Sequence, residues 1–212
     1  MDIYQMISSY VHKEQAEGMT DLFSIMRALD RLGKAGNTKK PTILKMQTVL
    51  FNSFQNLLSR TEKGHPIHLS SPFEGCQTIE GGLWEAQNWP VENSDSFDAI
   101  IKLAWGHNTM NLPAHIHEGS SRVVVITKGK GFFHFSTTDF EDFNGQNISM
   151  LEITEGNIIC FPGDYIHTFS TNESSSLEFL SYHNPYFGLD DPRQYTLTPF
   201  EWRPISYHHS AS

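Results

Sequence analysis

Two stretches of the chain decide its fold: PAHIHEGSSRVVVITKGKG (residues 113–131) and GNIICFPGDYIH (residues 156–167). In both, short runs of β-branched and other apolar residues are bounded by glycine, proline or serine, which is typical of strands joined by tight turns. The first stretch predicts a strand from Arg122 to Thr127 that ends in a turn over Lys128–Gly131. In the second, the pair Pro162-Gly163 predicts a tight turn near the end of the segment.

Similar segments recur outward from these two stretches, from about residue 63 onward. Each is rich in β-branched and aromatic residues, and turn residues separate them at intervals of about a dozen positions. That spacing indicates an antiparallel sandwich or barrel. The segments lie at 81–89, 97–106, 122–136, 148–163 and 176–188. A further segment, 195–207, is expected either to complete a sheet or to pair with a second subunit.

Residues 1–62 have a different pattern, with apolar side chains recurring at the 3.6-residue spacing of amphipathic helices. One helix is expected around Leu22–Leu32 and a second around Ile43–Leu57, with a weaker one near residues 3–10. A helix-turn-helix unit is the alternative, but the second helix is apolar where a recognition helix carries polar residues. We therefore expect an N-terminal helical segment over 1–62 that packs against a β domain over 63–212.

The composition excludes several classes of protein. The 212 residues include 24 acidic and 15 basic side chains, for a formal net charge of −9, so the surface repels nucleic-acid phosphates. No apolar run reaches the roughly 18–20 residues of a membrane span, and the first residues lack the basic and apolar regions of a secretory signal. Two cysteines cannot build a disulfide framework. We therefore expect a cytoplasmic protein that binds neither nucleic acid nor a membrane.

The chain has 11 histidines, and three of them lie in the two stretches that decide the fold. Side chains alternate along a strand, so His115 and His117 project from one face of the sheet. Inside a small barrel that face is the interior, where His167 from another strand joins them. Three neutral imidazoles converging there form a metal site with positions left open for water or substrate.

In these motifs the chain resembles the cupin superfamily. The resemblance rests on six positions of the two cupin motifs: His115, His117, Gly129, Gly156, Pro162 and His167. The glycine that follows the proline of the second motif is displaced by one position, to Gly163. The resemblance covers about residues 95–185 and implies a mainly β fold, a jelly-roll β-barrel, to which the N-terminal helical segment is added. Cupins often dimerise, so it also implies a homodimer.

The chain departs from the family pattern at Arg122, where cupins usually carry a carboxylate metal ligand. Arginine stays protonated and cannot ligate a metal, which leaves three histidines without a carboxylate. Glu118 is a weaker alternative ligand, because it adjoins His117 and should point away from the ligand face. His107 is a second alternative ligand. Three-His cupins include thiol dioxygenases, such as cysteine dioxygenase, and diketone-cleaving oxygenases. The resemblance therefore implies Fe(II) on the three histidines, with zinc, nickel or manganese as alternatives.

Four further residues are candidates for a catalytic role: Arg122, Tyr165, Tyr182 and His183. An inward Arg122 would bind an anionic substrate through two parallel hydrogen bonds, and the alternative is an arginine at the barrel mouth paired with Glu118 or Asp164. The tyrosines would donate hydrogen bonds near the open metal positions, and Tyr182 resembles a late tyrosine of cysteine dioxygenase. His183 would act as a base or support the site from behind.

The residues and the resemblance together predict a metal-dependent cupin, a non-haem Fe(II) dioxygenase of the thiol-dioxygenase type that acts on a small anionic or chelating organic substrate. Two alternatives stay open. One is a small-molecule-binding or sensing cupin without turnover, and the other is a metal-dependent isomerase or lyase in which His183 or a tyrosine moves a proton. Oxygen consumption would indicate the dioxygenase, and turnover without oxygen would indicate the isomerase or lyase. Stabilisation by a ligand without formation of a product would indicate the binding protein.

Overall fold

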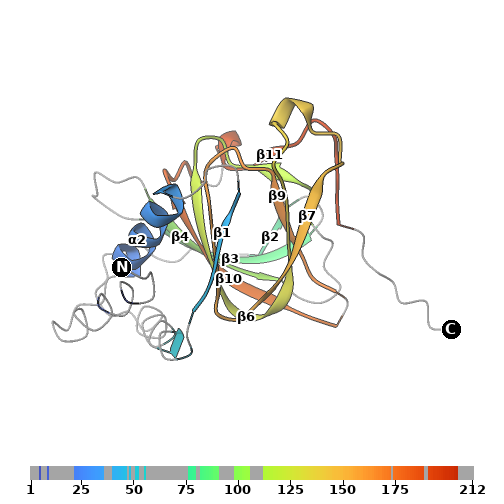
Figure 1. The fold of residues 1–212 in the computed structure, drawn as a ribbon. Helices are drawn as coiled ribbons and strands as arrows, with labels where there is room; N and C mark the ends of the chain where they lie inside the picture. Colours follow the sequence, from blue (N-terminus) through green and yellow to red (C-terminus); the bar gives the residue numbers. More distant parts are fainter. Residues whose placement is uncertain are drawn as a thin grey trace.

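The fold is that of a computed structural model, which describes residues 5, 9, 22–35, 40–46, 48, 51–52, 55, 76–79, 82–90, 98–105, 112–172, 174–188 and 191–204. Its elements are, in chain order, α2 (Leu22–Ala35), β1 (Thr42–Lys45), β2 (Cys76–Ile79), β3 (Gly82–Pro90), β4 (Ala99–Trp105), β5 (His115–Ile116), β6 (Ser121–Ser136), the 3-10 turn η1 (Phe140–Asp142), β7 (Ile148–Thr154), β8 (Asn157–Phe161), β9 (His167–Ser170), β10 (Leu177–Asn184), the 3-10 turn η2 (Pro192–Gln194) and β11 (Thr196–Leu197). The expected mainly β fold with an N-terminal helix is confirmed (Figure 1).

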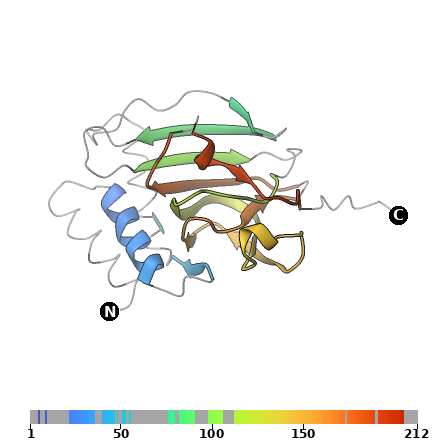
Figure 2. The same ribbon diagram turned by 90° about the horizontal axis from the view of Figure 1, so that it is seen from above.

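Strand β6 joins the two sheets of the barrel. Its first part pairs with β8 and β10, and its last part pairs with β7 and β9. One sheet therefore has the strand order β1-β8-β6-β10-β4-β3-β2, and the other has the order β7-β6-β9-β5-β11. All of these pairings are antiparallel, and the two sheets face each other across a common interior (Figure 1 and Figure 2).

The turn expected over Lys128–Gly131 is wrong, because these residues lie inside β6 at the point where the strand bends. Gly129 has a φ of +81°, and a Cβ added there would lie 2.0 Å from the carbonyl oxygen of Ser176. The register with β10 shifts between Glu178 and Phe179, as it does at a β-bulge. Glycine is needed at the bend because the backbone there is left-handed and closely approached.

The interior between the sheets is filled by apolar and aromatic side chains. Side chains alternate along β6, so Val124 and Ile126 face inward, while Val123 and Val125 are buried on the opposite face. The inward cluster draws on both sheets: Leu112, Val124, Ile126, Phe133, Ile153, Ile159, Phe161, Tyr165, Phe169, Leu177 and Phe179. This core holds together the strands that carry the motif histidines.

Helix α2 covers the outer face of the first sheet, where it packs against β6 and β8 (Figure 1). Its apolar side buries Ile25, Met26 and Leu29. Gly33 permits close packing, because a Cβ there would lie 2.6 Å from the Cβ of Cys160 on β8. Among the described residues, no helix combines the length and the hydrophobicity needed to cross a membrane.

The second helix expected around Ile43–Leu57 is wrong in its first part. Thr42–Lys45 form β1, which pairs with β8 from Thr42 opposite Cys160 to Lys45 opposite Asn157. The edge of β8 offers backbone hydrogen bonds, and the β-branched pair Thr42-Ile43 favours the extended conformation, so tertiary pairing overrides the helical periodicity. The described residues that follow, 48, 51–52 and 55, are helical.

The N-terminal segment thus contributes a strand to the barrel as well as a covering helix. The division expected between residues 62 and 63 stays a prediction, because residues 56–75 lie outside the described residues. The weaker helix expected near residues 3–10 also lies largely outside them, although residues 5 and 9 are helical.

His134 generates a test of this packing that depends on pH. It lies on β6 with its Nε2 2.8 Å from the Ser170 hydroxyl, and burial lowers its pKa from 6.5 to about 4. The unfolded chain therefore takes up a proton as the pH falls below 6.5, whereas the folded protein does so only near pH 4, and stability is lost across that window. Between pH 7 and pH 4 the unfolding free energy of both proteins should fall. We expect the fall to be about 2 kcal/mol smaller in His134→Gln than in the wild type, because glutamine takes up no proton. Urea unfolding at each pH measures this, and parallel profiles for the two proteins would contradict it.

Candidate metal centre

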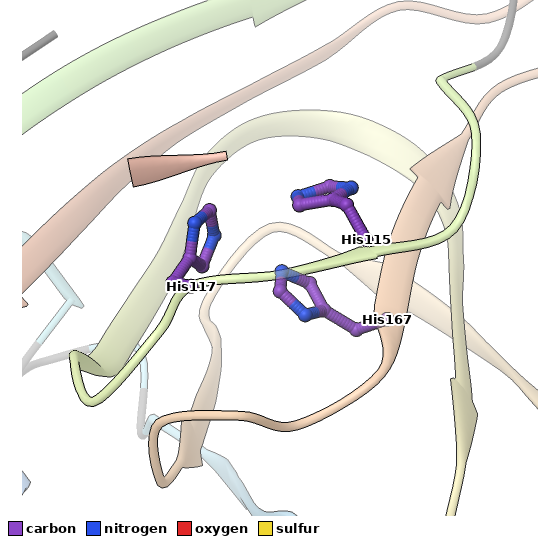
Figure 3. Close-up of side chains that lie close together, drawn as sticks. All are labelled: His115, His117 and His167. Atoms are coloured by element: carbon purple, nitrogen blue, oxygen red, sulfur yellow. The ribbon is translucent and has the colours of Figure 1, made fainter. Parts of the chain in front are cut away.

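Three histidines meet in the barrel interior (Figure 3). His115 lies in β5, His117 follows that strand by one residue, and His167 begins β9. His115 pairs directly with His167 across the two neighbouring strands, so both side chains leave the sheet on the same side. One nitrogen of each ring lies within 4.8 Å of the others, and the ring centroids are 4.5 to 5.0 Å apart. The two sequence motifs therefore converge on one cluster.

The outward nitrogen of each ring is held by a backbone carbonyl. Nδ1 of His115 lies 3.0 Å from Pro113 O, Nδ1 of His117 lies 2.5 Å from Gln194 O, and Nδ1 of His167 lies 2.7 Å from Tyr165 O. A carbonyl oxygen only accepts hydrogen bonds, so each Nδ1 must carry the proton and donate it. Each Nε2 then keeps its lone pair, which is the arrangement found in histidines that ligate metals.

Burial keeps the three histidines neutral. It is the largest cause that lowers the pKa of His115 from 6.5 to about 4, and it lowers the pKa of His117 and of His167 well below 6.5. The positive charge of Arg122 adds to the lowering of each pKa. Neutral imidazole is the form that binds a metal ion, so the cluster needs to release no proton at pH 7 to serve as a ligand set.

The loops that carry His117 and His167 are joined to each other by hydrogen bonds. Asp164 N donates to His117 O at 3.1 Å, and Gly119 N donates to the Asp164 carboxylate at 3.0 Å. Gly163 makes this contact close, because a Cβ there would lie 2.6 Å from Ser120 N. The relative position of the two histidines therefore depends on a glycine in the Pro162-Gly163 turn.

A C-terminal segment closes one side of the cluster. Strand β11 pairs with β5, so this part of the 195–207 segment completes a sheet. Just before it, Gln194 accepts from His117 with its carbonyl oxygen and contacts His183 Nδ1 with its side chain at 2.7 Å. The Tyr195 ring lies 4.3 Å from the His115 ring. Sequence reasoning missed Gln194, because no motif or spacing marks it and only the return of the chain after β10 brings it to the cluster.

Arg122 lies in the same interior wall. It is 1% exposed, and in the strand register it stands opposite His183 on β10 and Phe161 on β8. The ring of Phe161 in turn lies 4.5 Å from the ring of His167. Its Nη1 donates to Ser120 O at 3.2 Å, to Ser121 O at 3.1 Å and to the Ser120 hydroxyl. The guanidinium group thus faces the interior that holds the histidines.

The structure forms neither of the ion pairs considered for Arg122 at the barrel mouth. Glu118 accepts a hydrogen bond from the Thr196 hydroxyl at 2.7 Å, and Asp164 accepts from Gly119 N. Glu118 is also not part of the histidine cluster found among the described residues. The other alternative ligand, His107, lies outside the described residues.

His183 extends the polar part of the wall. It is buried on β10, and its ring centroid lies 6.0 Å from that of His117. Burial is the largest cause that lowers its pKa well below 6.5, so this ring is neutral as well. The contact with Gln194 uses Nδ1 and leaves Nε2 for another partner.

Tyr165 lies in the interior core. Its ring is 6.1 Å from that of Phe135 and 6.0 Å from that of Phe161. The hydroxyl is buried and has no hydrogen-bond partner within the described part of the chain. Burial raises its pKa, so it stays protonated and is able to donate a hydrogen bond.

Tyr182 is not brought to the cluster. It neighbours His183 on β10, and successive side chains of a strand point to opposite faces. Its hydroxyl donates to the Asp98 carboxylate at 3.0 Å, and Asp98 forms an ion pair with Arg27 of α2 at 2.6 Å. The side chain of Tyr182, one of the four candidate catalytic residues, therefore lies on the face of the sheet that α2 covers, away from the three histidines.

The close approach at Gly163 generates a matched pair of substitutions. We expect Gly163→Ala to lower the unfolding free energy by about 2 kcal/mol, because the new Cβ collides with backbone that cannot move without shifting the His117 loop. Gly119→Ala, in the facing loop, has no atom within 4 Å of its Cβ and meets only the strain of its φ of +62°. We expect Gly119→Ala to lower the unfolding free energy by about 1 kcal/mol. Denaturant unfolding measures both, and an equal or larger loss for Gly119→Ala would contradict the interpretation.

Comparisons with known proteins agree with this architecture. A family model described as Cupin matches residues 82–188, which is half of the chain. No curated protein gives a sequence match to the chain.

Several solved structures are similar to part of the chain at low sequence identity. A cupin-like protein from Thermotoga maritima is 12% identical, with 53% of this chain and 77% of that chain covered, at a TM-score of 0.40. A variant of oxalate decarboxylase from Bacillus subtilis is 14% identical, with 54% and 29% covered, at a TM-score of 0.43. A polyketide cyclase from Streptomyces resistomycificus is 14% identical, with 57% and 84% covered, at a TM-score of 0.38. By the family match over residues 82–188, the chain belongs to the cupin family.

Proposed function

We propose that this cupin is a metal-dependent enzyme, a non-haem Fe(II) dioxygenase that acts on a small anionic or chelating organic substrate. The observation that carries the proposal is the cluster of His115, His117 and His167, three neutral and oriented imidazoles with no carboxylate among them. Three neutral ligands leave the charge of a divalent metal uncompensated, which favours a negatively charged substrate.

The cluster fits a transition metal on its own chemistry. Every Nδ1 is occupied by a carbonyl oxygen, so each ring presents Nε2 as its available donor. Imidazole ligands suit iron, zinc, copper and nickel, and iron is our choice because the three-His cupins that the sequence resembles use it. When bound, the metal would bind O2 and substrate and would act as a Lewis acid.

The neighbouring residues supply the remaining functions of the site. Arg122 would bind the negative charge of the substrate and stabilise an oxyanion that develops during the reaction. Tyr165 and His183 are neutral polar groups of the same interior, and each is able to hold or transfer a proton. The aromatic core around Phe161 would exclude water from the reacting groups.

A second candidate function is supported by His183. Its Nδ1 contacts Gln194, which fixes the ring and leaves Nε2 facing away from that contact. A neutral, oriented histidine beside a metal-bound substrate would serve a proton transfer, as an isomerase or lyase requires. This alternative needs no oxygen, and the two candidates are therefore separable by experiment.

Metal content tests the ligand assignment. We expect the untagged protein to carry nearly stoichiometric metal, with iron dominant, and the variant with His115, His117 and His167 replaced by alanine to lose it. Mass spectrometry of the purified proteins measures this. His134→Gln is the control, because it changes a buried histidine on the face of β6 that points away from the barrel interior, and it should keep the metal. Absence of metal from the wild type, even after anaerobic reconstitution with Fe(II), would contradict the proposal.

Oxygen consumption tests the reaction class. The Fe(II)-loaded protein should consume O2 with a member of a panel of small thiols, diketones and carboxylic acids, and the triple alanine variant should show only background consumption. An oxygen electrode and product analysis measure the stoichiometry. Turnover that proceeds equally well without O2 and with zinc or manganese would instead support the isomerase or lyase.

A further inference from the structure

One edge of the Arg122 guanidinium group is occupied and the other edge is free. Nη1 donates to the carbonyl oxygens of Ser120 and Ser121 and to the Ser120 hydroxyl. Nε and Nη2 are fully buried and have no hydrogen-bond partner within the described part of the chain. These two nitrogens are neighbours on the guanidinium plane, and they present parallel N–H bonds on one side of it.

The charge of Arg122 also lacks a counter-charge. The residue is 1% exposed, and no aspartate or glutamate forms an ion pair with it in the part of the chain that the structure describes. Burial lowers its pKa, and no carboxylate acts against that lowering. A buried charge without a partner is costly, so a bound anion would stabilise this arrangement.

The titratable groups that surround Arg122 inside the barrel do not supply that anion. Its positive charge lowers the pKa of four histidines that desolvation already keeps neutral: His115, His167 and His183, which are buried, and His117, which is partly buried. A divalent metal on the first three would add further positive charge. Among the described residues no group therefore supplies the negative charge, which a bound anion would provide.

We propose that the Nε–Nη2 edge of Arg122 binds the carboxylate of a short organic acid, whose second donor atom, a hydroxyl, thiol or oxo group, reaches the three-histidine centre. The part concerning the second donor atom rests on the proposed function. A carboxylate is planar and offers two oxygens side by side, which matches two parallel N–H donors. Arg122 stands opposite His183, whose ring lies 6.0 Å from that of His117, so a short acid is the appropriate size.

The experiment separates the carboxylate site from the metal site. The full chain is freed of metal with EDTA and titrated in a calorimeter with glycolate and with its neutral analogue glycolamide. The variant Arg122→Lys keeps the charge and loses the pair of parallel donors. The control, Arg193→Lys, makes the same change at an exposed arginine that is paired with Asp191.

The wild type and Arg193→Lys should bind glycolate, and neither should bind glycolamide comparably. Arg122→Lys should bind glycolate roughly tenfold or more weakly, because a charged two-point hydrogen bond becomes a single contact. After loading with zinc, glycolate should gain affinity relative to acetate, which has the carboxylate without the second donor.

Equal affinity for glycolate and glycolamide would overturn the carboxylate site, and this comparison holds even if Arg122→Lys does not fold. Full affinity in Arg122→Lys, or tighter binding of inorganic phosphate than of glycolate, would also overturn it. Glycolate that gains nothing over acetate in the zinc-loaded protein would overturn the second contact alone. A chain that binds glycolate but no metal would overturn the proposed function and leave the Arg122 site standing.

Discussion

Strand β6 belongs to both sheets, and the bend at Gly129 sets how the two halves of the barrel face each other. Before the bend the strand pairs with β8 and β10, and this pairing places Arg122 opposite His183. After the bend it pairs with β7 and β9, and this pairing places Phe135 opposite His167. Backbone hydrogen bonds on both sides hold each register, because a slip of one residue would turn every interior side chain outward.

The interior that results is apolar over most of its volume and carries its polar groups in one cluster. Burial acts on each kind of group in the direction that removes charge, so the pKa of every clustered histidine falls. Burial lowers the pKa of Arg122 as well, but the guanidinium group keeps its proton under ordinary conditions and stays charged. Among the described residues, neutral histidines and the buried guanidinium of Arg122 share this interior, and their electrostatics would favour an anionic ligand under the proposed function.

The errors of the sequence interpretation have a common physical cause. The turn expected over Lys128–Gly131 and the first part of the helix expected around Ile43–Leu57 were both local predictions, and pairing with distant strands overrode both. Gln194 has no local signature, and its position depends on how the chain returns after β10. The face of Tyr182 follows from the register of β10, which a propensity for extended structure does not specify.

The sequence by itself determined the family, the mainly β fold and the three histidines of the candidate centre, because the two motifs are short and their spacing is set by strand alternation and tight turns. Their convergence, the carbonyl oxygens that orient each ring and the burial of Arg122 were decided only by the tertiary structure. These features join residues far apart in the chain, such as His117 with Gln194, and no local pattern encodes a contact of that range. The free edge of Arg122 belongs to the same class, since it is defined by what the described part of the folded chain leaves unpaired.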